Sequence, residues 1–163
     1  MISLYKAYVL PHLEYCCPLL LSIYKVLKNN IERTNHYTIK TILNLGNSAT
    51  YDFCLEMADM DKLEQRHTLQ SLILFFKCFK LDGPNYISQF FTPRLTKYNL
   101  RDSGLNVVQP PYNSLVMHNS FLYMIAHIRN QLPTVTKSST TLAQFRTRLN
   151  NVNFTGCQCM NCT

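Results

Sequence analysis

Three cysteines near the C-terminus are the residues best suited to bind a metal. Cys157, Cys159 and Cys162 form a C-x-C-x-x-C pattern. Thiolates are good zinc ligands, but a structural zinc site is tetrahedral and needs four nitrogen or sulfur ligands. A second copy of the chain, or a distant histidine such as His118, would have to supply the fourth. The pattern therefore leaves two alternatives open, a zinc site completed from elsewhere and a reduced, disordered tail.

Acidic residues that could bind catalytic metal ions are scarce. Asp59 and Asp61 form the one close acidic pair, whereas two-metal phosphoryl transfer needs carboxylates that converge on the ions. Asp61 and Glu64 instead have the spacing of a capping box that opens a helix. The five histidines are scattered over different segments, and no glycine-rich phosphate loop is present. We therefore expect no catalytic centre in this chain.

Basic residues are concentrated in the second half of the chain. The formal net charge is +7, of which residues 1–82 carry +1 and residues 83–163 carry +6. Tyr98, Tyr112 and Tyr123 lie among these basic residues, a combination that suits phosphate contacts and base stacking on single-stranded nucleic acid. An ordinary solvated basic surface would have the same composition. The candidate phosphate contacts are Arg94, Arg101, Arg129, Arg146 and Arg148.

Helical periodicity dominates the segments that must position these residues. Apolar residues recur at three- and four-residue spacing, which places them on one face of a helix. The predicted helices lie within residues 1–45, 50–57, 61–81, 114–131 and 138–151. In the last of them we expect Leu142, Phe145 and Leu149 to face inward and Arg146 and Arg148 outward. Gly83-Pro84 ends the third helix. Three prolines and a glycine within residues 92–113 predict a loop-rich connection with at most one short strand.

The first helical segment has a predicted core face. Tyr5, Val9, Leu13 and Cys16 follow each other at three- or four-residue spacing, and Pro11 interrupts the run. A proline removes one backbone donor and kinks or breaks a helix. We therefore expect two short helices or one kinked helix, with these four side chains facing inward.

The composition predicts one all-α domain. The chain has 163 residues, of which 47% are hydrophobic and 15% charged, which is a core-forming composition. Only 4 glycines are present, too few for the many tight turns of an all-β fold. We expect a compact multi-helix domain over residues 1–151, with a near-neutral half (1–83), a basic half (84–151) and a loop-rich middle segment. A flexible cysteine tail would follow at residues 152–163.

The cysteine count indicates a reduced, intracellular chain. Seven cysteines cannot all pair, and Cys16, Cys17, Cys54 and Cys78 lie in apolar runs, where a reduced cysteine packs as a small core side chain. The most apolar window contains two prolines and a glutamate, so we expect no membrane-spanning helix. The N-terminus lacks a signal-peptide pattern. The nucleus or cytoplasm is the expected location.

The segment from Leu4 to Cys16 reads L-Y-K-A-Y-V-L-P-H-L-E-Y-C. It resembles the region just after the palm in the reverse transcriptases of LINE-type, non-LTR retrotransposons of the jockey and chicken-repeat group. Further stretches resemble the same family in the same order, and together they cover nearly the whole chain. These stretches are Ile31-Glu-Arg33, the run from Ile39 to Leu45, Leu63-Glu-Gln-Arg66, Phe76-Lys-Cys-Phe-Lys80 with Gly83, Asn130-Gln-Leu-Pro133, and Leu142 to Leu149. Ile128-Arg129 stands where the family usually has tryptophan, which this chain lacks.

The resemblance implies a C-terminal fragment of an RNA-directed DNA polymerase that handles template and primer. Its partner would be RNA or an RNA–DNA hybrid. The family's magnesium-binding motif, an aromatic residue followed by Ala-Asp-Asp, lies in the palm upstream of the matching region. No catalytic residue therefore transfers to this chain, and we expect it not to be an enzyme by itself. The alternative from a different class is an inert helical protein-interaction module with no nucleic-acid role.

Overall fold

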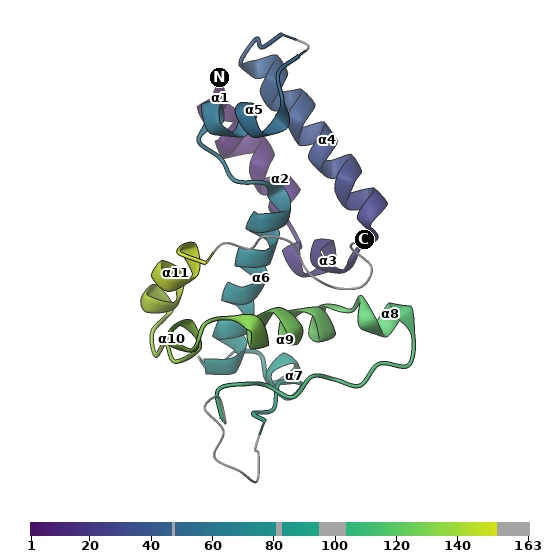
Figure 1. The fold of residues 1–163 in the computed structure, drawn as a ribbon, viewed down its shortest axis with the longest axis vertical. Coiled ribbons are helices and arrows are strands. Elements are labelled where there is room, and N and C mark those ends of the chain that lie inside the picture. The colour runs from purple at the N-terminus through teal and green to yellow at the C-terminus, as the bar shows by residue number, and fades with distance from the viewer. Residues whose placement is uncertain (47, 81–82, 95–103, 153–163) are drawn as a thin grey trace. The chain divides into compact units, whose positions relative to one another are not determined.

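The computed structural model describes residues 1–46, 48–80, 83–94 and 104–152 (Figure 1). The chain divides into two compact units, unit 1 (Met1–Thr68) and unit 2 (Leu69–Thr163). Helix α6 (Leu63–Lys80) runs through the boundary. The described residues form helices and one isolated antiparallel bridge between Pro93 and Val107, without a sheet. The predicted all-α fold is confirmed, and no described helix has the length and apolarity needed to cross a membrane.

Unit 1 is built from short N-terminal helices and one long helix. Its elements before α6 are α1 (Ile2–Leu4), η1 (Tyr5–Val9), α2 (Leu10–Glu14), α3 (Cys17–Ser22), α4 (Lys25–Ile42) and α5 (Tyr51–Ala58). Thr50 begins α5, and its hydroxyl accepts the Phe53 N–H, which satisfies one of the free donors at the helix start. The core cluster consists of Tyr5, Leu10, Ile39, Cys54, Leu55, Ala58 and Leu63.

A π-helical turn, η1, changes which N-terminal residues face this core. The Leu10 N–H donates to Tyr5 O, five residues back, and Pro11 has no N–H to continue the α-helical ladder. Tyr5 and Leu10 are therefore buried, and Val9 is 44% exposed. The predicted inward position of Val9 is wrong because the wider turn shifts the register by one residue.

Cys16 departs from its predicted core position as well. It has φ 56°, in the left-handed region, where it ends the first helical run, and its side chain is exposed. Cys17, Cys54 and Cys78 are buried with free thiols, as predicted. Because the left-handed backbone at Cys16 separates α2 from α3, only the second of the two adjacent cysteines enters the interior.

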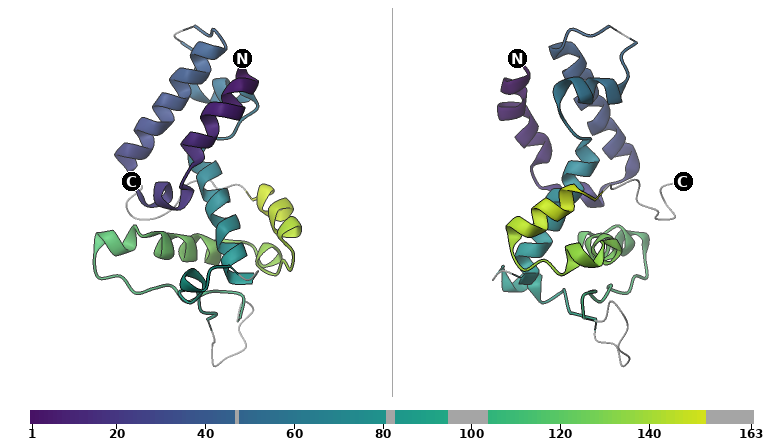
Figure 2. Two further views of the ribbon diagram at one scale, coloured as in Figure 1. Left: turned by 180° about the vertical axis from the view of Figure 1, so that it is seen from behind. Right: turned by 60° about the vertical axis from the view of Figure 1, so that its left-hand side comes forward.

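The described part of unit 2 contains the second part of α6 and five shorter helices. These are α7 (Asn85–Ser88), α8 (Leu115–His118), α9 (Phe121–Gln131), α10 (Thr134–Lys137) and α11 (Leu142–Asn150). The predicted helix over 114–131 is divided, because Ser114 caps α8 and Ser120 caps α9, each accepting a backbone N–H three residues on. Figure 2 shows α10 joining the end of α9 to α11.

Aromatic side chains pack the core of unit 2. Phe76 of α6 stacks on Phe145 of α11 at 4.5 Å between ring centroids. Phe75 meets Phe91 edge-to-face at 4.7 Å. Phe145 and Leu149 are buried, as the periodicity predicts. These contacts join residues far apart in the sequence, so α6 is the central element of this core.

Gly83 follows α6 in a position that excludes a larger residue. A Cβ at Gly83 would lie 2.5 Å from the Cα of Cys78 and 3.0 Å from Lys77 O. Such separations are shorter than van der Waals contact. The sequence predicts this glycine as a helix stop, and the structure shows that it also lets the chain pass directly against the last turns of α6.

Candidate nucleic-acid interface

The two units differ in charge. Residues 1–68 contain seven Lys and Arg and seven Asp and Glu, whereas residues 69–163 contain nine basic and two acidic residues. The two acids, Asp82 and Asp102, lie outside the described residues. The described part of unit 2 therefore contains no carboxylate side chain. The whole net charge of +7 belongs to unit 2, a stronger asymmetry than a division at Gly83 indicates.

Arg94 and Arg146 are the exposed members of the candidate arginine set. Arg146 lies on α11 and Arg94 in the extended segment after α7, and these elements lie on opposite sides of α9 in Figures 1 and 2. Arg101 lies outside the described residues. The set therefore does not form one common face in the described part of unit 2.

Arg148 is half-buried and already bound within unit 2. Its Nη1 donates to Val135 O at 2.6 Å and to Ser139 Oγ at 3.2 Å. This side chain joins α11 to the α10 region. Lys77 and Lys80, near the end of α6, are exposed and are therefore candidate phosphate contacts that the sequence analysis missed. Their position on the polar side of a strongly apolar helix is the signal that could have identified them.

Arg129 is buried, with 3% of its surface exposed. Its Nη2 donates to Lys137 O at 3.2 Å, while Nε and Nη1 have no hydrogen-bond partner. The guanidinium lies 5.9 Å from the ring centroid of Phe75. Burial lowers the pKa of Arg129 to about 10, so the side chain is still charged at neutral pH. This guanidinium offers no exposed surface to a phosphate.

Lys137 is a second buried cation of unit 2. Its Nζ donates to Asn106 Oδ1 at 2.9 Å and to Asn130 O at 2.6 Å. The Asn130 amide in turn exchanges two 3.0 Å hydrogen bonds with the backbone of Val107. The Asn130 carbonyl near the end of α9 thus helps to stabilise a cation, as expected at a helix C-terminus. Lys137 therefore has a structural role.

Four rings on α8, α9 and the preceding segment form a cluster that we call the aromatic ladder: Tyr112, His118, Tyr123 and His127. Ring centroids lie 4.9 Å apart for Tyr112–His118 and Tyr112–Tyr123, 4.7 Å for His118–Tyr123 and 6.3 Å for Tyr123–His127. Burial raises the pKa of Tyr123, and the neighbouring Tyr112 hydroxyl adds to the shift. Tyr112 and Tyr123 were predicted as stacking residues, but spacing alone did not reveal that two histidines join them.

Amide side chains border the imidazoles of the ladder. Gln109 Nε2 lies 3.3 Å from His127 Nδ1, and Gln131 Nε2 lies 2.9 Å from His127 Nε2. His118 Nδ1 lies 3.4 Å from the Asn119 side-chain oxygen. The ladder thus combines ring faces with groups that can donate and accept hydrogen bonds.

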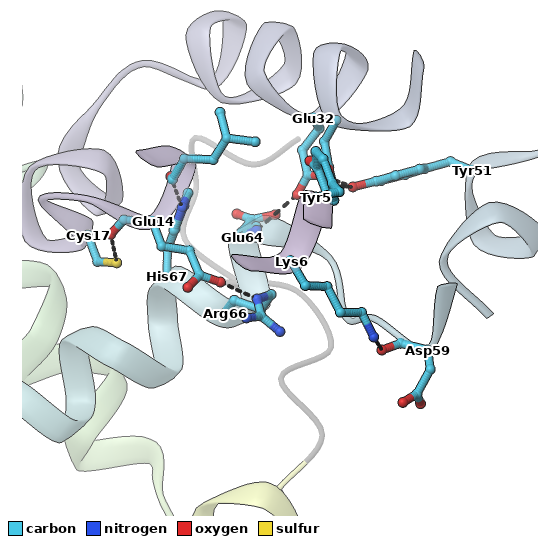
Figure 3. Close-up of polar contacts among 12 residues, drawn as sticks. Tyr5, Lys6, Glu14, Cys17, Glu32, Tyr51, Asp59, Glu64, Arg66 and His67 are labelled. Carbon is cyan, nitrogen blue, oxygen red and sulfur yellow. Dashed lines mark hydrogen bonds and ion pairs between the residues drawn. The ribbon is translucent and has the colours of Figure 1, made fainter. Parts of the chain in front are cut away.

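Two carboxylates of unit 1, those of Glu14 and Glu32, bind other groups of the same unit (Figure 3). Glu14 of α2 pairs with Arg66 of α6. Glu32 of α4 accepts the Tyr51 hydroxyl and, at 2.9 Å, the Glu64 N–H at the start of α6. The predicted Asp61–Glu64 capping box is therefore replaced by a cap from another helix, and Asp61 is exposed.

Hydrogen bonds extend this polar network through the core of unit 1. The Tyr5 hydroxyl donates to Asn35 Oδ1, and Asn35 Nδ2 donates to the Tyr51 hydroxyl at 2.8 Å. Burial, followed by the contact with Glu32, raises the pKa of Tyr51. Burial also raises the pKa of Tyr5. The network keeps both phenols neutral and holds the helices together, which is a structural role.

No cluster of three or more His, Cys, Asp or Glu side chains within the described ranges is placed to hold a metal ion. Cys157, Cys159 and Cys162, the predicted zinc ligands, lie outside those ranges. A scan of protein-family models and searches of curated proteins and of solved structures found no match to this chain.

Proposed function

We propose that this chain binds nucleic acid through unit 2, with RNA or an RNA–DNA hybrid as the partner. The observation that carries the proposal is the segregation of charge. Unit 1 is neutral, unit 2 carries the whole net charge of +7, and its described part has no carboxylate to repel a phosphate. A net positive surface attracts polyanions over a Debye length of about 10 Å in 0.1 M salt.

The resemblance to the post-palm region of non-LTR reverse transcriptases supports the same proposal. In that role the chain would hold template and primer, and the polymerase chemistry would belong to the palm. A primer-extension assay tests the remaining enzymatic hypothesis, because product from this chain alone would overturn the inference from its missing paired carboxylates.

Binding across a salt series tests the proposal. Anisotropy of a labelled RNA strand and of an RNA–DNA hybrid would be measured from 50 to 300 mM salt. Six phosphate contacts predict a log–log slope of about −5 on a duplex and about −4 on a single strand. An affinity that does not change with salt, or no detectable binding at low salt, would contradict the proposal.

Charge reversal at exposed arginines tests whether unit 2, rather than unit 1, binds the nucleic acid. We expect the double variant Arg94→Glu, Arg146→Glu to weaken binding at least about tenfold and to reduce the salt slope by about 1 to 2. Arg33→Glu is the matched control, since Arg33 is an exposed arginine of the neutral unit 1. Arg33→Glu changes the net charge by two and the double variant by four, so a logarithmic loss of affinity in Arg33→Glu about half that of the double variant would indicate a response to net charge alone.

Exposed apolar side chains on unit 1 favour the second candidate, a protein-interaction module. Tyr8, Tyr15 and Tyr24 are each about 70% exposed or more, and solvent-facing apolar groups of this kind mark interaction sites when they are contiguous. The salt series separates the candidates, because absence of RNA binding removes the first and leaves the second.

Zinc binding by Cys157, Cys159 and Cys162 stays a prediction. Native mass spectrometry with and without a chelator tests it. A mass decrease of one zinc ion on chelation is expected if the three thiolates find a fourth ligand.

A further inference from the structure

We propose that the aromatic ladder of unit 2 is a stacking site for the bases of single-stranded nucleic acid. This inference rests on the proposed function. It adds a location for the base contacts and a preference for single strands. The ladder would supply base contacts, and the basic residues elsewhere in unit 2 would supply phosphate contacts.

The ring geometry suits stacking. Each of the four rings has a neighbour within 4.7–6.3 Å, and the pairs include edge-to-face, tilted and stacked arrangements. Mutual packing of this kind holds rings in place. Tyr112 is nevertheless 52% exposed, and the other three are half-buried. The rings are thus positioned before binding while part of their surface remains open to solvent.

The polar groups beside the rings suit base edges. The amides of Gln109, Asn119 and Gln131 contact the imidazole nitrogens of the ladder. Amide side chains can donate and accept at once, which is how they recognise the edges of nucleobases. A base stacked on His118 would have the Asn119 amide next to it, and a base stacked on His127 would have the Gln109 and Gln131 amides next to it.

The charge of the surroundings favours a nucleic-acid strand over an acidic or neutral partner. The described part of unit 2 has no Asp or Glu, and unit 2 carries the whole net charge of the chain. A single strand is the expected form, since the base faces of a duplex are already stacked on one another and only unstacked bases are free for aromatic side chains.

The affinity contributed by the aromatic ladder should differ from that of the phosphate contacts in its dependence on salt. It contains no Lys or Arg, so it should contribute affinity that depends on the bases and changes little with salt. Loss of one stacking ring should weaken binding by roughly 5- to 150-fold. The salt slope should stay the same.

Two short strands of equal length and equal phosphate number test the site, one with bases and one abasic. We expect the wild-type chain to bind the base-containing strand at least about tenfold more tightly. Tyr112→Ala should lose about tenfold on that strand and be unchanged on the abasic strand. Tyr112→Phe should retain binding because the ring remains. Tyr86→Ala is the matched control, an exposed tyrosine of the same unit outside the ladder.

The outcomes distinguish failure of the ladder from failure of the proposed function. Salt-dependent binding with equal affinity for the two strands, or with no effect of Tyr112→Ala, would overturn the ladder and leave nucleic-acid binding by unit 2 intact. Binding of a duplex as tight as that of the single strand would also overturn the ladder. Absence of binding to either strand at low salt would remove both. Quenching of a 2-aminopurine base in the strand, lost in Tyr112→Ala, would support stacking directly.

Discussion

Arg66 in unit 1 and Arg129 in unit 2 are enclosed in different ways. Arg66 is partly buried and pairs with Glu14, so one charge balances the other. Arg129 is more deeply buried, and the described part of unit 2 has no carboxylate that could pair with it. Its Nε and Nη1 atoms have no hydrogen-bond partner. A buried charge is costly unless it is paired and hydrogen-bonded.

The difference shows how each unit uses its charges. In unit 1 two acids make internal contacts: Glu14 pairs with Arg66, and Glu32 binds Tyr51 and the start of α6. Unit 2 has no described acid and holds its buried cations with carbonyl and amide oxygens. Its positive charge is therefore not neutralised from within, which is the property that the proposed function uses.

Removal of Glu14 should have the largest effect on stability. Glu14→Gln leaves Arg66 partly buried without its carboxylate, and we expect a loss of about 2 kcal/mol, less than a fully buried pair would lose. Urea unfolding followed by circular dichroism measures the change. Asp52→Asn is the control, since the Lys62–Asp52 pair has side chains 53% and 77% exposed and should matter by less than about 0.5 kcal/mol. Equal effects would show that the burial of Glu14 is unimportant.

Removal of the Arg129 charge should stabilise the protein rather than destabilise it. Arg129→Met replaces an incompletely paired buried cation with an apolar chain of similar length. We expect the free energy of unfolding to rise by about 1 kcal/mol, after the lost bond to Lys137 O is offset. Hydrogen exchange of α9 and urea unfolding check this. Arg146→Met, at an exposed position, should change little. A loss of stability in Arg129→Met would mean that the single hydrogen bond outweighs desolvation.

Alkaline pH should give the smallest effect, and Tyr51 of unit 1 should contribute to it. The pKa of Tyr51 is raised above 10 in the folded state, so above pH 10 the unfolded chain releases a proton that the folded chain keeps. Stability therefore falls with rising pH, by about 0.4 kcal/mol between pH 10 and 10.5 for this residue. Urea midpoints at both pH values measure it.

A pair of tyrosine variants isolates this contribution. Tyr51→Phe should flatten the pH dependence, whereas Tyr37→Phe, at an exposed position, should preserve it. Other groups whose pKa is also raised, among them Tyr5 and Tyr123, should account for the slope that remains. An unchanged slope in Tyr51→Phe would exclude Tyr51 as its source.

Local sequence features predicted the regular helices well. Periodicity placed Leu142, Phe145 and Leu149 inward and Arg146 and Arg148 outward. Phe145 and Leu149 are buried and Arg146 is exposed, as predicted, whereas Leu142 and Arg148 are half-buried. Periodicity failed for Val9, because it assumes an α-helical register and η1 has a wider turn. It also joined α8 to α9, although Ser120 is a good N-cap and begins a new helix.

The candidate site was less predictable because its contacts join distant segments. Arg129 was expected at the surface since arginine is usually exposed, but Phe75 and Lys137 enclose it. The start of α6 was expected to be capped by Asp61 locally, and Glu32 takes that role from another helix. In both cases a tertiary partner decided the outcome.

The amino-acid sequence by itself determined the helical class and the distribution of charge, because both depend on residue types and short spacings. Only the tertiary structure decided which charges are available. It buries Arg129 and Lys137, commits Glu14 and Glu32, and brings Tyr112 against His118 and Tyr123. The physical reason is that burial and ring contacts depend on which remote segments cover a helix face. Helix propensity and net charge involve no such neighbour.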